Sequence, residues 1–188
     1  MTEQGPHSER RGMSSARRIF RSPVAWALTV LVVAGVAVAL ALFQPWRLFT
    51  NTTVVEAVPT ISSAPGGAQP PPEPKTLARG EFVSHEHGTS GTAVILQLAD
   101  GSRVLRLENL DTSDGPDLHV WLAAAPVLPG KSGWFVFGDA AHVDLGSLKG
   151  NKGSQNYAIP SDADLAKLTA TTIWCQRFHV SFGAAQLK

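Results

Sequence analysis

Cys175 is the only cysteine in the 188-residue chain, so it cannot form a disulfide within the chain. It lies in an apolar segment with strand-like alternation, and the N-terminal part of the chain predicts export of this segment from the cytoplasm. An unpaired cysteine in an exported domain is a buried core residue, an intermolecular disulfide partner, a reactive thiol or a cofactor ligand. Arg177 would share its strand face and could favour the thiolate.

Three histidines are candidate ligands beside this sulfur for a haem or a transition metal. His87 belongs to a His85-x-His87 pair, whose spacing could chelate a metal. His179 shares the strand parity of Cys175, and His119 lies on another predicted strand, so either could supply a second ligand if the strands adjoin. For each histidine the alternative is an exposed residue or one satisfied by a neighbouring hydrogen bond.

The other chemical motifs are weak or missing. The acidic turn 111–117 contains three aspartates but lacks the spacing and the terminal glutamate of a calcium-binding EF-hand, and turn formation explains it. The chain has no Gly-x-Ser-x-Gly elbow, His-Glu-x-x-His helix, phosphate loop or dinucleotide fingerprint. It therefore shows no motif of a stand-alone enzyme, although a hydrolase triad could still assemble in three dimensions.

Residues 23–43 carry no charge, and as a helix they would be about 31 Å long, which matches the bilayer core. Five arginines precede this segment and only Arg47 follows closely, so the N-terminus is expected in the cytoplasm and the C-terminal domain outside a cell membrane. The alternative is a signal peptide cleaved at Ala39-Leu40-Ala41, but the apolar region of such peptides is shorter, about 7–15 residues. We expect an uncleaved single-pass anchor.

The rest of the chain divides by composition. Residues 44–79 are rich in Pro, Gly, Ser and Thr, which predicts a tether. Residues 80–188 carry eight Lys and Arg against eleven Asp and Glu, a net charge near −3 without a basic stripe, which excludes nucleic acid as a partner. We therefore expect four parts: a basic cytoplasmic tail (1–22), a transmembrane helix (23–43), a tether (44–79) and an extracytoplasmic domain (80–188).

Short apolar runs separated by turn residues predict an all-β fold for residues 80–188. Residues 92–98 and 103–107 flank Asp100-Gly101, which favours a tight hairpin. The segment 117–122 alternates, so Leu118, Val120 and Leu122 should face the core. Further strands are expected at 134–137, 141–145, 155–159 and 171–182, and a short helix at 161–168. This number of strands is typical of an antiparallel β-sandwich or jelly-roll-like fold.

Seven short motifs occur in the order found in the DM13 domain. They are GEF (80–82), EHGTSGTA (86–93), LRLENL (105–110), GPDLHV (115–120), LGSLKGN (145–151), NYAIP (156–160) and IWC (173–175). The chain resembles a membrane-anchored DM13 protein over about residues 80–188. This resemblance implies an extracellular β-rich domain with a redox or electron-transfer role, and its nearly invariant cysteine matches Cys175. DM13 domains accompany cytochrome-like and DOMON domains, which these residues lack, so we expect a separate redox protein as electron partner.

Two functional hypotheses follow. The first is a membrane-anchored extracytoplasmic domain for electron transfer or thiol redox chemistry, centred on Cys175, with His87, His119 or His179 as co-ligands of any cofactor. The second is a non-catalytic binding or envelope-organising module, presented by the tether to an envelope component.

Overall fold

The computed structural model describes residues 22–60 and 72–188. The chain consists of two compact units that divide between Gln44 and Pro45. The described part of the first unit is a single helix, and the second unit contains all the strands. The basic segment 1–21, on which the predicted orientation depends, lies outside the described residues.

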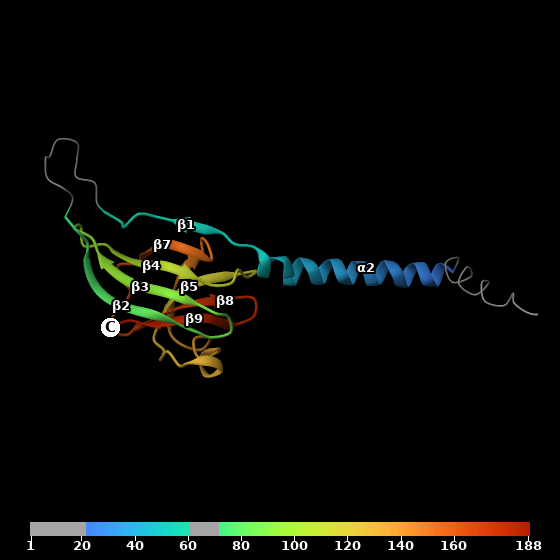
Figure 1. The fold of residues 1–188 in the computed structure, drawn as a ribbon. Coiled ribbons are helices and arrows are strands. Elements are labelled where there is room, and N and C mark those ends of the chain that lie inside the picture. Colours follow the sequence, from blue (N-terminus) through green and yellow to red (C-terminus); the bar gives the residue numbers. More distant parts are fainter. Residues whose placement is uncertain (1–21, 61–71) are drawn as a thin grey trace, which may run out of the picture. The chain divides into compact units, whose positions relative to one another are not determined.

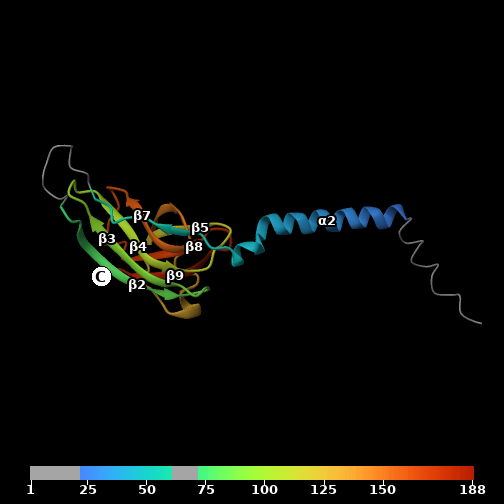
Figure 2. The same cartoon turned by 45° about the horizontal axis from the view of Figure 1, so that its top comes forward.

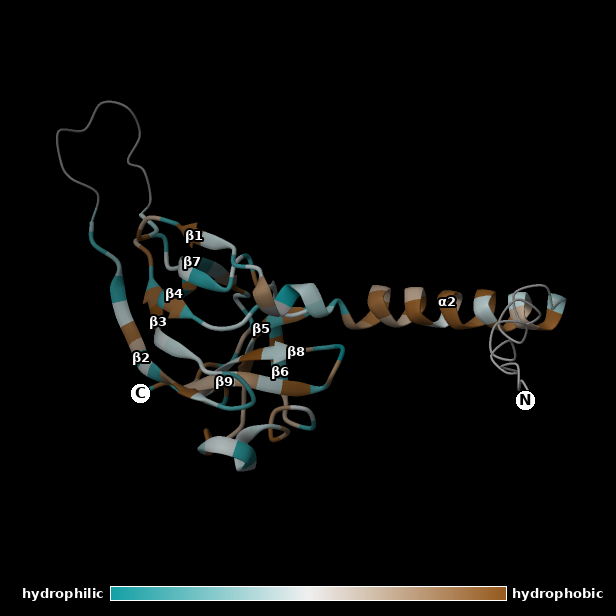
Figure 3. Cartoon of the chain, turned by 45° about the vertical axis from the view of Figure 1, so that its right-hand side comes forward, coloured by the Kyte–Doolittle hydropathy of each residue, from teal (hydrophilic) through white to brown (hydrophobic). Residues whose placement is uncertain are grey.

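Helix α2 (Pro23–Phe43) is apolar along its whole length (Figure 3). The Ser22 side chain caps it by accepting a hydrogen bond from the Ala25 N–H, and Pro23 occupies the first turn, where a missing N–H costs nothing. Gln44 ends the helix in the left-handed region with φ of 42°. Among the described residues, α2 is the one helix long and apolar enough to cross a membrane.

The described strands form one sheet of nine, in the order β1-β7-β4-β3-β2-β9-β8-β5-β6. Neighbouring strands are antiparallel, except that β1 and β7 are parallel. The sheet curls into a half-barrel (Figures 1 and 2), so the predicted all-β class is confirmed. The strands are β1 (Thr53–Val55), β2 (Lys75–Ser84), β3 (Ser90–Gln97), β4 (Arg103–Asp111), β5 (Leu118–Ala123), β6 (His142–Ser147), β7 (Lys152–Ile159), β8 (Ala170–Cys175) and β9 (Val180–Gln186); the short 3₁₀ helices are η1 (Pro45–Phe49) and η2 (Gly130–Gly133).

Strand β2 produces the curl because it changes partner along its length. Its residues 75–81 pair with β3, whereas residues 82–84 pair with β9. Gly80 lies next to this change of partner, where a Cβ atom would come within 2.1 Å of the Gln186 carbonyl oxygen. A residue without a side chain is therefore required where the two strands come together.

Two predictions of local structure are confirmed. Strands β3 and β4 form the predicted hairpin, and Gly101 in its turn has φ of 85°. Strand β5 alternates as predicted: Leu118, Val120 and Leu122 join the main core with side chains of β3, β4 and β9, whereas Trp121 packs in a second cluster. The main core thus joins the two halves of the curled sheet. We call the second group the outer-face cluster; its buried members are Trp121, Ala123, Ala125, Phe137, Ala170, Trp174 and Ala184.

The strand predicted at 134–137 is wrong. This segment forms consecutive turns, in which the Trp134 N–H donates to the Lys131 carbonyl and the Gly138 N–H donates to the Phe135 carbonyl. Phe137 is fully buried in the outer-face cluster. The apolar residues here cover the sheet instead of joining it, a tertiary contact that a strand-like composition does not reveal.

The helix predicted at 161–168 is also wrong, because these residues form turns. The Arg103 guanidinium donates hydrogen bonds to the carbonyl groups of Pro160, Ser161 and Ala163. Carbonyl groups at this point would accept the first hydrogen bonds of a helix. Hydrogen bonds from the Arg103 side chain of β4 therefore take the place of the first backbone hydrogen bonds of a helix.

The segment 171–182, predicted as one strand, forms β8 and β9 with a turn between them. Cys175 and Val180 are paired at the turn end of this hairpin. His179 adopts φ of 52° in the turn, a left-handed conformation that reverses the chain. Because apolar residues lie on both sides of the turn between β8 and β9, the sequence alone does not reveal the turn.

Part of the predicted tether belongs to the folded unit. Strand β1 pairs with β7, and β2 begins at Lys75, before residue 80. The Glu56 carboxylate accepts hydrogen bonds from Lys149 Nζ at 2.8 Å and from the Asn156 N–H at 2.6 Å. Arg106 donates to the carbonyl groups of Glu56 and Ala57. The ordered unit therefore begins at Pro45, while residues 61–71 lie outside the described part.

Candidate functional site

Cys175 is the last residue of β8 and is fully buried in the main core. It faces Leu118 across the β5–β8 ladder and Val180 across the β8–β9 ladder. Ile173 lies in the same core, whereas Trp174 lies in the outer-face cluster. Two consecutive residues of β8 thus serve the two faces of the sheet.

Burial raises the pKa of the Cys175 thiol above its ordinary value, because an apolar surrounding disfavours the thiolate. Backbone N–H groups of Phe178 and Arg177, which hydrogen-bond to the sulfur, act in the opposite direction on this pKa. The Asp117 carboxylate raises the pKa further, and the Arg177 charge lowers it. The protonated thiol is therefore favoured. Arg177, predicted on the strand face of Cys175, lies instead in the turn between β8 and β9, and its effect on the thiol pKa is smaller than that of burial.

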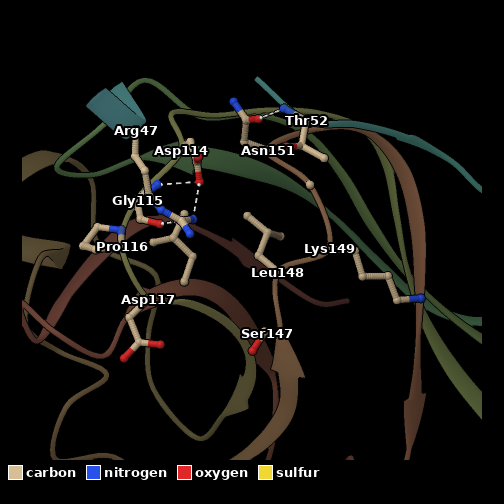
Figure 4. Close-up of a pocket in the computed structure, with 12 residues that line it drawn as sticks. Arg47, Thr52, Asp114, Gly115, Pro116, Asp117, Ser147, Leu148, Lys149 and Asn151 are labelled. Carbon is tan, nitrogen blue, oxygen red and sulfur yellow. Dashed lines mark hydrogen bonds and ion pairs between the residues drawn. The ribbon is translucent and has the colours of Figure 1, made fainter. Parts of the chain in front are cut away.

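A pocket of about 300 Å³ lies at the start of β5 (Figure 4). Leu118, the residue that faces Cys175, is part of its wall. Asp117 also lines the pocket, and its carbonyl accepts a hydrogen bond of 2.9 Å from the N–H of Gln176, the residue after Cys175. The other lining residues are Arg47, Thr52, Asp114, Gly115, Pro116, Ser147, Leu148, Lys149, Gly150 and Asn151.

Residues just after helix α2 build the polar side of this pocket. Arg47 Nη1 lies 3.5 Å from Asp114 Oδ1 and donates to the Gly115 carbonyl at 3.2 Å. The Asn151 side-chain oxygen accepts a hydrogen bond of 2.7 Å from the Thr52 N–H. In the sequence Arg47 is recognisable only as a charge beside the helix, because no local motif signals a contact with a residue 67 positions away.

The three predicted histidines have separate surroundings. His87 is half-buried and packs on Phe182, with ring centroids 4.0 Å apart, and burial lowers its pKa. His119 Nδ1 lies 2.8 Å from a carboxylate oxygen of Asp144. His179 is exposed in the turn between β8 and β9. Within residues 22–60 and 72–188, no hydrogen bond or ion pair joins these imidazoles to the Cys175 sulfur.

A metal ligated by this cysteine and these histidines does not fit the arrangement. In the part of the chain that the structure describes, no three His, Cys, Asp or Glu side chains are grouped so that they could hold a metal ion. The carboxylates of the acidic turn 111–117 do not form a metal site either, because Asp111 pairs with Lys152 and Asp114 pairs with Arg47.

His85 does not form a chelating pair with His87. Its Nδ1 lies 2.7 Å from Ser181 Oγ, which lies 2.7 Å from Thr172 Oγ1, so His85 begins a buried row of polar side chains. A Cβ atom on Gly133 would come within 2.3 Å of His85 Nε2, so η2 packs directly on the imidazole. Burial lowers the pKa of His85 below its ordinary value. The geometry is that of a structural link between the sheet and the loop after β5.

An aromatic stack on the outer face was not predicted. The rings of His142 and Trp121 are parallel within 7°, with centroids 3.8 Å apart, and Trp121 stacks on Trp174 at 5.0 Å. His142 is exposed, whereas both tryptophans are more than nine-tenths buried. The outward parity of Trp121 was visible in the sequence, but the register of β5 with β6 and β8 was not.

Comparison with known proteins gives one result. A family model described as electron transfer DM13 matches residues 81–187, which is more than half of the chain and covers the thiol, the aromatic stack and most of the pocket lining. No curated protein and no solved structure matches the chain.

Proposed function

The chain belongs to the electron transfer DM13 family, and from this membership we propose that its β domain transfers electrons with Cys175 as the redox-active group. The burial of the Cys175 thiol is the observation that carries the choice of chemistry. Disulfide exchange requires a thiolate and an accessible sulfur, whereas an electron can pass through protein to a buried group. Burial therefore supports one-electron chemistry over mixed disulfides.

In this proposal, a separate redox protein accepts one electron from Cys175, the thiol proton leaves with that electron, and a thiyl radical remains. The Asp117 carboxylate, which lines the pocket, is the proposed acceptor of this proton and passes it to solvent. An external one-electron donor then reduces the radical, and a proton returns to the sulfur. No cofactor is needed for this cycle.

Helix α2 anchors the domain in the proposed arrangement, since it is long and apolar enough to cross a membrane. The five arginines of residues 1–22 support a cytoplasmic N-terminus and a β domain outside the cell membrane in this proposal. The electron partner is then a separate redox protein that meets the domain there.

Stopped-flow oxidation of the full chain in detergent with an inorganic one-electron oxidant tests the proposal. Cys175→Ser should lose one rapidly transferred electron equivalent relative to the unchanged protein. Val180→Ala is the matched control, because Val180 faces Cys175 in the β8–β9 ladder and its truncation disturbs the same core without removing the thiol. Equal electron counts in Cys175→Ser and the unchanged protein would contradict the proposal.

A binding module is the second candidate function, and the pocket is the observation that favours it. Its volume of about 300 Å³ is at the lower end of the range for small-ligand sites. A small molecule that raises the melting temperature of the full chain, and fails to do so in Arg47→Ala, would support this function.

A further inference from the structure

We propose that Trp121 and Trp174 form an electron relay between Cys175 and the surface, and that His142 is the point where a metal-centred one-electron acceptor docks. The proposal rests on the function proposed for Cys175. It adds an electron-transfer route and a docking surface, which together specify how a buried thiol exchanges electrons with a partner.

The relay crosses the sheet through the backbone of β8. Trp174 and Cys175 are consecutive, so their Cα atoms are about 3.8 Å apart and their side chains point to opposite faces. The Trp174 ring stacks on Trp121 with a centroid distance of 5.0 Å, and the Trp121 ring stacks on His142 at 3.8 Å. A continuous path of bonds and stacked rings therefore leads from the thiol in the main core to an exposed imidazole.

The surroundings of the two indoles suit them to lose and regain an electron without moving a proton. Both Nε1 atoms are buried, and neither has a hydrogen-bond partner among the described residues. An indole N–H is a donor only, so an oxidised ring without an adjacent acceptor has no place to send its proton. Each oxidised tryptophan thus stays a radical cation, and it returns to the starting state when a single electron arrives.

His142 presents a suitable end of the relay. Its Nδ1 lies 2.9 Å from the Ala140 carbonyl oxygen. A carbonyl group only accepts hydrogen bonds, so Nδ1 carries the proton of the neutral ring and Nε2 carries the lone pair. Imidazole nitrogen is a good ligand for iron, copper and nickel, so an acceptor with an open metal position can contact this atom.

The overall step is balanced. The acceptor gains one electron through His142 and Trp121, and Trp174 passes on the electron that Cys175 gives up. The thiol proton moves to the Asp117 carboxylate, and both indoles end in their original state. The reaction converts one thiol and one oxidised acceptor into one thiyl radical and one reduced acceptor.

The experiment attaches a ruthenium photosensitiser to the His142 imidazole of the full chain in detergent. Peptide mapping identifies the species labelled only at that residue, and a flash with an external quencher generates the oxidised label. Transient absorption then follows the indole radical cation. The species labelled at His179, an exposed histidine of the β8–β9 turn, is the labelling control.

Trp121→Phe should abolish the radical-cation signal, while Trp134→Phe should leave it unchanged. The second variant is a matched control because Trp134 also has a buried Nε1 without a partner but packs edge-on against Phe135, outside the stack. Circular dichroism checks that both variants are folded. In Trp174→Phe the signal should form on Trp121 but decay independently of Cys175.

Outcomes for the relay and for the thiol can be distinguished. We expect the signal in the unchanged protein and in Cys175→Ser, with slower decay in the variant because the electron from sulfur is missing. A radical-cation signal of equal lifetime in both proteins would show that the tryptophans can be oxidised, but it would overturn Cys175 as the electron donor. A signal no larger than that of Trp121→Phe, or of the His179-labelled control, would overturn the relay itself.

Discussion

Leu118 and Cys175 face each other across the β5–β8 ladder, and Leu118 is also part of the pocket wall. Leu118 therefore belongs both to the lining of a polar pocket and to the strand position paired with the buried thiol.

Leu118→Ala should expose the thiol. The truncation shortens a side chain that lines the pocket and is paired with Cys175, so alkylation by iodoacetamide under native conditions should accelerate strongly. Val120→Ala is the control, because Val120 lies on the same face of β5 but faces Ile173 and does not line the pocket. Both truncations remove buried methyl groups, at a cost in unfolding free energy of about 1–5 kcal/mol. Equal acceleration in the two variants would mean that unfolding, and not the pocket, governs access.

Arg106→Gln should release β1 from the sheet. Arg106 holds the carbonyl groups of Glu56 and Ala57, so its loss should speed proteolytic cleavage near residues 50–60. Arg103→Gln offers a comparison, since Arg103 donates to carbonyl groups of the 160–163 turn instead. Mass spectrometry of the first fragments checks the result, and cleavage at the same sites in both variants would argue against the assigned role.

Gly153→Ala should destabilise the domain more than Gly146→Ala. Both glycines have positive φ, of 97° and 109°, so each substitution should cost about 1 kcal/mol. A Cβ atom on Gly153 would also meet the Val54 carbonyl oxygen at 2.1 Å, whereas one on Gly146 has no neighbour within 4 Å. The extra loss of stability in Gly153→Ala therefore measures the β1–β7 contact. Equal melting temperatures of the two variants would show that this contact contributes nothing to stability.

Stability should fall as the pH falls below the ordinary His85 pKa of 6.5. Burial lowers the pKa of His85 in the folded chain. Between the unfolded and folded pKa values the unfolded chain therefore binds more protons, and falling pH stabilises it relative to the folded chain. One such group contributes a slope of at most about 1.4 kcal/mol per pH unit. Urea unfolding at several pH values should show this slope reduced in His85→Gln and retained in His179→Gln. An unchanged slope in His85→Gln would assign the effect to other groups.

The sequence was sufficient for features that depend on local pattern. The apolar span, the hairpin at Asp100-Gly101 and the two faces of β5 follow from composition, a turn dipeptide and period-two alternation, and the structure contains all three. The DM13 resemblance was likewise visible in ordered short motifs, and the family match confirms it.

Features that depend on contacts between distant residues were not predictable. Arg103 converts a helix-like segment into turns, and Arg106 attaches a tether-like segment to the sheet, although neither contact leaves a local signal. The same limit applies to the site. The histidine ligands suggested for Cys175 stay a prediction, whereas the strand register that places Leu118 opposite the sulfur and assembles the aromatic stack on the other face left no signal in the sequence.

The most direct test of the account is protein-film voltammetry of the full chain in a lipid film, with Cys175→Ser and Val180→Ala beside it. We predict a one-electron wave in the unchanged protein and in Val180→Ala, with a potential that falls by about 59 mV per pH unit because one proton leaves with the electron. The wave should be missing in Cys175→Ser. A wave that survives in Cys175→Ser would contradict the assignment of Cys175 as the redox-active group.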